Sequence, residues 1–511
     1  MLNLFSGSRT EHPMANAQRA SEIIAGLPSD SAKALTEIAG LIESVHSTES
    51  LRLDRRLEAI LLLDESAQRH LRRATRDYVA MLDNEIHESR FWLALHEFYA
   101  RSTEAFLACL DEITTGAKGA GAAKGHLHSL AVRCLRSIGG LQKWLALRYG
   151  RLDEIRWRQA CAIFNLAVRA QFAEQRIAPY PKFPTETAIA HEFLRIVAFA
   201  ASSPGSLLPA EMDAADHLIA SVVDDVRLEA KRSASGTHWI DLAGERPPAR
   251  RVARLEATAS TRYLALASAA AKLESLQGAI VFEGRIPETA QLPEYCSVEN
   301  VVAAAKHLCI HWSDEPLARR HPRVPMKQRI EIGHGFDRAI ETLSGGSRQE
   351  AELDFSAPAS ISTWVTEDIG AGGFGARVLH PNFRLLRVRC LLAVQVEGSA
   401  GWSIAVVLRL ERHSADEFSV DTETLTRTPA AVTVLIDNDG ILSSQGEPAI
   451  LLAPPQADHD DFQILLRSGV HAPEQSFEFE SNGGRFHLYP QQVLLRGPDY
   501  ELIRCRIASL A

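Results

Sequence analysis

The spacing of apolar residues changes near residue 312, and this change constrains the fold more than any other feature of the chain. Upstream, apolar residues recur every three or four positions from about residue 15, as in the segment that contains Leu35, Ile38, Leu41, Ile42 and Val45. Such spacing forms one apolar stripe on a helix. Downstream, short segments alternate apolar and polar residues, which predicts half-buried strands. The sequence therefore predicts an α+β multidomain protein, all-α at its N-terminal end and antiparallel β at its C-terminal end.

The helical region is expected to span residues 1–300 and to be divided by a loop. After two helices before residue 83, the helical spacing continues near 86–113, 122–148, 152–175, 185–202, 208–232, 251–276 and 297–311. The stretch from Gly236 to Arg251 holds Pro247 and Pro248 and predicts a loop or a boundary between two subdomains. A repeat of constant length is not evident, so the pattern gives only weak support to an α-solenoid.

The β-rich part is expected to form one or two small barrels. Its predicted strands are 386–396, 402–410, 418–425, 431–436, 450–452, 462–466 and 477–479. Asn482-Gly483-Gly484 predicts a tight hairpin turn because glycine and asparagine tolerate positive φ. The segment 344–362, rich in Ser, Gly and Ala, predicts a long loop. We expect a first barrel over 301–430 and a second small β domain over 431–511, which could be a further barrel.

Composition excludes several classes of protein. The chain of 511 residues has a net charge of −9 and a pI of about 6.1, whereas a general nucleic-acid binder is more often basic. The most apolar stretch, Tyr263 to Phe282, contains Lys272 and Glu274, so we expect no membrane span. The seven cysteines are scattered without a CxxC pair, as in reduced proteins. With no secretory signal at the N-terminus, these features predict a cytoplasmic protein.

A compact basic cluster lies where the two patterns meet. Arg319, Arg320 and Arg323 occur within five residues of an acidic chain, around the stiff residue Pro322. The planar guanidinium group donates paired hydrogen bonds to phosphate oxygens or to the O6/N7 edge of guanine, and its face stacks on bases. The cluster is therefore a candidate site for an anionic ligand, although such a run of charges at a domain boundary is more often only solvated.

A glycine-rich cluster follows at Asp368-Ile-Gly370-Ala-Gly372-Gly373-Phe-Gly375. Glycines let the backbone approach a ligand closely, and Asp368 offers acceptors for guanine N1 and N2. The segment resembles the glycine-rich loop of protein kinases. A kinase also needs a lysine soon after it and the HRD and DFG motifs, none of which follows. A flexible turn between strands is the simpler alternative for this segment taken alone.

The two clusters, in this order within β-rich sequence, resemble the PilZ domain family over residues 312–430. Arg319 and Arg323 match its RxxxR motif, and Asp368, Gly370 and Gly373 occupy the defined positions of its (D/N)xSxxG motif. The segments that begin at Trp402 and Phe418 are similar to the last strands of its barrel. The resemblance implies an antiparallel β-barrel and a receptor for cyclic di-GMP.

The resemblance also implies roles for individual residues. Arg319, Arg320 and Arg323 would hold phosphates and guanine faces, Asp368 a guanine edge, and Gly373 would allow close approach. Gly370 stands where the motif has serine, so one hydroxyl contact is missing, and a hydrogen bond to a charged group contributes about 1.5–3 kcal/mol. Two hypotheses therefore remain: a receptor that relays cyclic di-GMP to a protein partner through the helical region, and a degenerate PilZ interaction scaffold.

Other chemistry-bearing residues do not form a recognisable catalytic or metal site. His307, Cys309 and His311 alternate along a predicted helix, where positions two apart do not share a face, so a structural role is more probable than zinc binding. A nucleophile elbow or an acid–base pair is not evident. We therefore expect no enzyme activity, no cofactor and no metal, with cyclic di-GMP as a ligand only.

Overall fold

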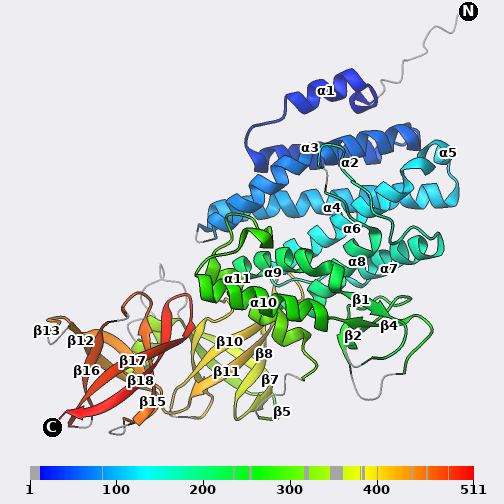
Figure 1. Cartoon of the computed structure of the whole chain (residues 1–511). Helices are drawn as coiled ribbons and strands as arrows, with labels where there is room; N and C mark the ends of the chain where they lie inside the picture. Colours follow the sequence, from blue (N-terminus) through cyan, green and yellow to red (C-terminus); the bar gives the residue numbers. More distant parts are fainter. Residues whose placement is uncertain are drawn as a thin grey trace, which may run out of the picture. The chain divides into compact units, whose positions relative to one another are not determined.

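The computed structural model (Figure 1) divides into two compact units, Met1–Leu317 and Ala318–Ala511. It describes residues 12–510 except for 83, 184, 234–235, 252–255, 316–320, 346–360, 380, 382–385, 400, 439–440, 456–458, 473 and 482. The predicted α+β architecture, a helical region followed by β-barrel domains, is confirmed. The loop predicted at 344–362 lies almost entirely outside the described residues.

The N-terminal unit is mainly helical. Its α-helices are α1 (Ala17–Ala25), α2 (Ser31–Ser47), α3 (Leu53–Ala80), α4 (Glu85–Thr115), α5 (Ala120–Ala123), α6 (Leu127–Ala146), α7 (Glu154–Arg169), α8 (Ile189–Ala201), α9 (Pro209–Val222), α10 (Ala267–Glu283) and α11 (Val298–Trp312). Several begin where a polar side chain accepts a hydrogen bond from a backbone N–H of the first turn, such as Asp30, Asn84, Asp153 and Ser297. Among the described residues, no helix has the length and apolarity to cross a bilayer.

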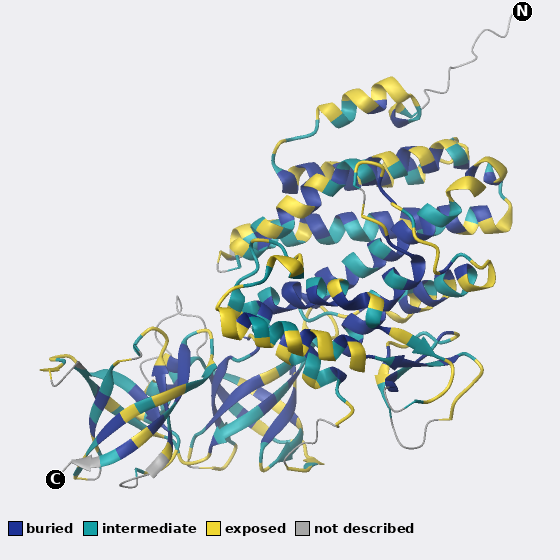
Figure 2. Ribbon diagram, viewed as in Figure 1, coloured by how far each residue is buried: buried dark blue, intermediate teal, exposed yellow. Residues whose placement is uncertain are grey.

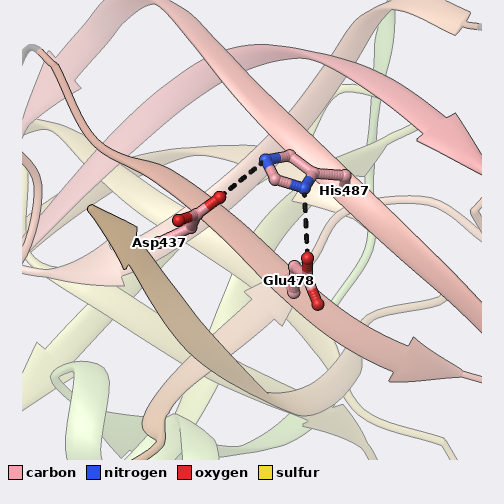
Figure 3. Close-up of side chains that lie close together, drawn as sticks. All are labelled: Asp437, Glu478 and His487. Carbon is pink, nitrogen blue, oxygen red and sulfur yellow. Dashed lines mark ion pairs between the residues drawn. The ribbon is translucent and has the colours of Figure 1, made fainter. Parts of the chain in front are cut away.

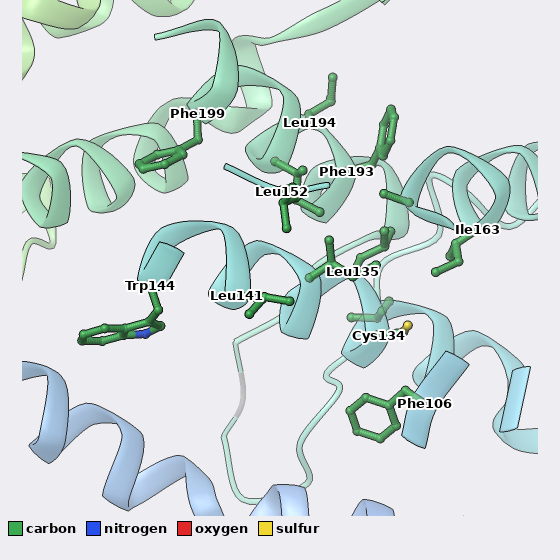
Figure 4. Packing of buried hydrophobic residues seen from close by; sticks show 14 of the residues in the cluster. Phe106, Cys134, Leu135, Leu141, Trp144, Leu152, Ile163, Phe193, Leu194 and Phe199 are labelled. Carbon is green, nitrogen blue, oxygen red and sulfur yellow. The ribbon is translucent and has the colours of Figure 1, made fainter. Parts of the chain in front are cut away.

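Helix α6 lies within the core of this unit (Figure 4). Leu135 and Trp144 on α6 are almost fully buried, as are Phe106 on α4 and Phe193 on α8. Burial of one such side chain contributes about 1.5–3 kcal/mol. Figure 2 shows the result, with exposed residues on the outer faces of the long helices and buried residues on the faces that meet.

A small antiparallel sheet interrupts the helices. Its strands β1 (Arg227–Glu229), β2 (Gly236–Asp241), β3 (Ala249–Arg250) and β4 (Thr261–Ala265) pair in the order β1-β4-β2-β3. The sequence prediction was correct for the turn over 242–248 but wrong where these strands lie: β1 falls in the predicted helix over 208–232, β2 and β3 in the predicted loop, and β4 in the predicted helix over 251–276. The reason is physical: strands this short contain too few residues for a helical and an alternating pattern to be distinguished.

The C-terminal unit begins with a closed six-stranded barrel, called here the first barrel. Its elements are β5 (Arg323–Pro325), β6 (Arg329–His334), α12 (Phe336–Leu343), β7 (Ile361–Gly370), β8 (Gly373–Leu379), β9 (Leu391–Val396), β10 (Ser403–Arg412) and β11 (Glu417–Thr426). The strands pair in the order β7-β6-β9-β10-β11-β8, and pairing of β8 with β7 closes the ring. Strand β5 is added outside the ring on β7.

The second barrel closes in the same way. Its strands are β12 (Ala430–Asn438), β13 (Ile441–Leu442), β14 (Glu447–Leu451), β15 (His459–Arg467), β16 (Ser476–Ser481), β17 (Gly484–Arg496) and β18 (Tyr500–Leu510). The ring runs β12-β14-β15-β18-β17-β16, and β16 pairs with β12. β16 and β17 form the hairpin that the sequence predicted, and its Gly483 has a φ of +78°.

Helix α12 lies between the two barrels and joins their cores. Phe336 on α12 is fully buried in one apolar cluster with Ile404 and Val406 of the first barrel and Leu465 and Tyr500 of the second. The backbone N–H at the start of this helix also donates to a carboxylate of the second barrel, from Phe336 to Asp499 Oδ2 at 2.6 Å. The two barrels are therefore held together by a shared core.

Candidate functional site

Four of the six predicted site residues lie together on the first barrel. Arg323 opens β5, Asp368 and Gly370 lie in β7, and Gly373 opens β8. β5 pairs with β7 so that Arg323 lies opposite Gly370. The other two predicted residues, Arg319 and Arg320, lie outside the described residues.

Arg323 forms the centre of this site. Its Nη1 lies 3.1 Å from Asp368 Oδ1 and 2.8 Å from Asp421 Oδ1, and its Nη2 donates to the backbone carbonyl of Thr422 at 2.7 Å. The Arg323 side chain is only 9% exposed, whereas the two aspartates are about one third exposed, at 32% and 34%. One guanidinium group therefore holds two carboxylates at the surface of the barrel.

Asp421 is a site residue that the sequence analysis missed. It lies in β11 opposite Gly375 of β8, and Asp368 of β7 lies opposite the same glycine from the other side. Gly375 also donates its N–H to Asp368 Oδ1 at 2.9 Å. An aspartate in an alternating strand carries no signal that distinguishes it from an ordinary solvated position, so only the barrel's closure brings Asp421 to Arg323.

The glycines make room for the Arg323 side chain. A Cβ atom at Gly375 would lie 2.9 Å from Asp368 Oδ1 and 3.4 Å from Arg323 Nη1. At Gly373, where φ is +146°, a Cβ atom would lie 2.1 Å from the carbonyl oxygen of Thr422. The glycine-rich segment is therefore an ordered strand–turn–strand whose lack of side chains allows β5 and β11 to approach.

Gly370 is the position at which this chain departs from the PilZ motif. A Cβ atom there would lie 2.5 Å from the carbonyl oxygen of Pro322 and 3.0 Å from Arg323 Cγ. In this arrangement a serine would not fit unless β5 moved away. The substitution and the position of β5 thus depend on each other, which the sequence alone did not indicate.

A second polar cluster lies on the second barrel (Figure 3). His487 of β17 has Asp437 Oδ2 3.8 Å from its Nε2 and Glu478 Oε1 3.4 Å from its Nδ1. Its Nε2 also lies 2.7 Å from the Ser476 hydroxyl. The two carboxylates face different nitrogens of the ring, and the lone pairs of these nitrogens point in different directions. A metal ion bound to one nitrogen would therefore lie near only one of the carboxylates. This geometry is typical of a bridging ion pair rather than of a metal centre.

The histidines near the end of α11 have structural contacts. His307 Nε2 donates to the carbonyl oxygen of Ser202 at 2.7 Å, and the His307 and His311 ring centroids lie 4.2 Å apart. Cys309 donates to the carbonyl oxygen of Ala270 at 3.4 Å. These contacts show that the three side chains pack and form hydrogen bonds between helices.

Buried ion pairs connect the helices of the N-terminal unit. Arg133 on α6 pairs with Asp64 on α3 at 3.2 Å, and both side chains are at most 5% exposed. Burial raises the pKa of Asp64 to about 6, although Arg133 acts in the opposite direction. Lys143 pairs with Asp216 at 3.0 Å; burial alone would raise the pKa of Asp216, but Lys143 and Arg195 hold it well below its usual range. These ion pairs connect neighbouring helices, and each buried charge lies beside a charge of opposite sign.

The fold and the site together define a class of protein: a helical region followed by two β-barrels, with an arginine held by two aspartates on the first barrel. Residues 18–233 match the family described as "Cyclic-di-GMP receptor FimW, N-terminal domain". The helical region is thus similar to the N-terminal domain of a cyclic di-GMP receptor. The match covers less than half of the chain and lies outside the barrels, where the sequence analysis placed its resemblance. No curated protein and no solved structure matches the chain.

Proposed function

We propose that the protein is a cyclic di-GMP receptor without catalytic activity and that the ligand binds on the first barrel. Two independent observations support this proposal. The helical region matches a family of receptors for this dinucleotide. The first barrel, outside that match, places Arg323 beside Asp368 and a glycine-lined surface.

Each site residue has a proposed part in binding. Arg319, Arg320 and Arg323 hold the phosphates and stack on guanine, because guanidinium offers a planar fork and a flat face. Asp368 accepts hydrogen bonds from a guanine edge. Gly370 and Gly373 allow the ligand to approach the backbone.

The same contacts suggest how binding would be relayed. In the structure the Arg323 guanidinium group pairs with Asp368 and Asp421. A phosphate that binds Arg323 must therefore replace these carboxylates as its partner. Since Arg323 begins β5, this exchange changes the anchoring of the segment that precedes the barrel. We propose that the ligand shifts this segment between two states and alters binding of a protein partner by the helical region.

The observation that carries this proposal is the Arg323–Asp368 contact, and titration calorimetry with cyclic di-GMP tests it. We expect Arg323→Ala to weaken binding at least about a hundredfold, because a charge-assisted fork to phosphate is lost. Arg377→Ala is the matched control: Arg377 lies in β8 of the same barrel and pairs with Glu367 and Glu417 at the surface. Equal affinity of the Arg323 variant and the wild type would refute this site.

A degenerate scaffold is the second candidate, and one observation favours it. The carbonyl oxygen of Pro322 would lie 2.5 Å from a Cβ atom at Gly370, so it fills the space that a serine side chain would need there. If the wild type binds no cyclic di-GMP at tens of micromolar, the barrel is a docking module instead. A partner would then be retained equally with and without nucleotide, whereas nucleotide-dependent retention would count against a scaffold.

A further inference from the structure

Four arginines form a row along one face of helix α3. Arg69, Arg72, Arg73 and Arg76 are all exposed, whereas His70, between the first two, is buried. Residues at i, i+3, i+4 and i+7 lie on one side of a helix and here span about 10 Å. We call these four residues the arginine row.

The arginine row is poorly neutralised by its surroundings. In the part of the chain that the structure describes, its one ion pair is between Arg76 and the neighbouring Asp77, at 2.8 Å. The nearby Glu65 pairs with Lys182 at 3.5 Å instead. Four arginines and Lys182 against Asp77 and Glu65 give a local charge of +3, on a protein whose net charge is −9.

The neighbours of the row respond to this charge. Burial lowers the pKa of His70, and the positive charges of Arg69 and Arg73 lower it further. The guanidinium carbon of Arg72 lies 4.3 Å from the centre of the Phe183 ring, so this side chain is stacked in place with its N–H edges directed away from the ring. Like charges four residues apart destabilise a helix by about 0.2–0.5 kcal/mol per pair. Repulsion within the row therefore destabilises α3 in the isolated molecule, and a partner with negative charges would relieve this repulsion.

The shape of the row indicates the kind of partner. Small ligands bind in concave sites that bury most of their surface, whereas the row lies along the outer face of a helix. Guanidinium groups spaced along a helix match carboxylates spaced along another helix, each pair forming a fork-to-fork contact. We propose that the arginine row is the docking surface for an acidic helical segment of a partner protein. The proposal is independent of the nucleotide site on the first barrel.

Fluorescence anisotropy on the full-length protein, without nucleotide, tests this proposal. The probe is a labelled helical peptide with glutamates at i, i+3, i+4 and i+7, and the same peptide with lysines is the charge control. We expect the glutamate peptide to bind and Arg69→Glu/Arg73→Glu to weaken it at least about tenfold, because attraction becomes repulsion. Arg69→Gln/Arg73→Gln, which removes charge without reversing it and relieves repulsion within the helix, should give a smaller loss.

The matched control is Arg158→Glu/Arg169→Glu, which makes the same change of charge at exposed positions of α7. This variant should bind the peptide within about twofold of the wild type, since its changes lie on another helix and leave the four guanidinium groups of the row in place. Failure of the wild type to bind, or equal losses in the α3 and α7 variants, would overturn the proposal. Binding to phosphatidylserine vesicles through the row, with no binding of the peptide, would overturn it in favour of a membrane surface.

Discussion

The two barrels join their strands in the same order, yet their arginine–carboxylate contacts differ. In the described part of the chain, Arg323 of the first barrel is nearly buried between two aspartates, whereas Arg485 of the second pairs with Glu478 and Glu480 at the surface. In the first barrel, the second and third strands of the ring meet at the turn between Gly370 and Gly373. In the second, the matching strands β14 and β15 are joined by residues 452–458, which include Pro454 and Pro455. The comparison indicates that alternating apolar residues determine the barrel fold, whereas a few glycines and the added strand β5 determine the geometry around Arg323.

The largest expected effect concerns a glycine of the first barrel. Gly373→Ala should lower the free energy of unfolding by about 3–5 kcal/mol, because the new Cβ meets the Thr422 carbonyl at a positive φ. Gly469 of the second barrel also has a positive φ, +80°, but open space around it. Gly469→Ala should therefore cost only about 1 kcal/mol in urea unfolding. Equal costs would contradict the special role of the first turn.

Acid should act on the first barrel through His334. Burial lowers the pKa of His334 to about 4 from its ordinary 6.5, so the folded state favours the neutral ring. The corresponding stability is complete above pH 6.5 and is lost as the pH falls toward 4, by about 2–3 kcal/mol. We expect His334→Gln to reduce the loss of stability between pH 7 and pH 4 in urea titrations. An unchanged acid dependence would show that other groups cause it.

The smallest expected effect is a gain in affinity. Asp421→Asn removes one of the two carboxylates that hold Arg323, at 2.8 Å, so less free energy is spent in freeing the arginine for phosphate. Cyclic di-GMP should bind about three- to tenfold more tightly in calorimetry, a change near 1 kcal/mol. Weaker binding would instead place Asp421 in direct contact with the ligand.

Periodicity predicted most of the fold but not its short pieces. The long helices and the strands β10, β11, β12, β14, β15 and β16 follow apolar spacing closely, because burial of one face dominates their energies. The sheet of β1 to β4 was missed, and so was α12, whose eight residues lie between strands. In such segments tertiary contacts decide the conformation: Phe336 is helical because both barrels bury it.

The candidate site was predicted in part. Arg323 and Asp368 were identified from their motifs, and the structure brings them within 3.1 Å. Asp421 and the steric reason for Gly370 could not be predicted, since both depend on which strands become neighbours when the ring closes. Sequence order alone does not carry that information.

The apolar cluster shared by the barrels predicts that they fold and unfold together. A chain cut at residue 430 would leave Phe336, Ile404 and Val406 without the side chains of Leu465 and Tyr500 that cover them. Such a fragment would expose apolar surface and be prone to aggregate. The second barrel would then be required for folding of the first. Its removal would abolish ligand binding by the first barrel although no residue of the binding site is changed.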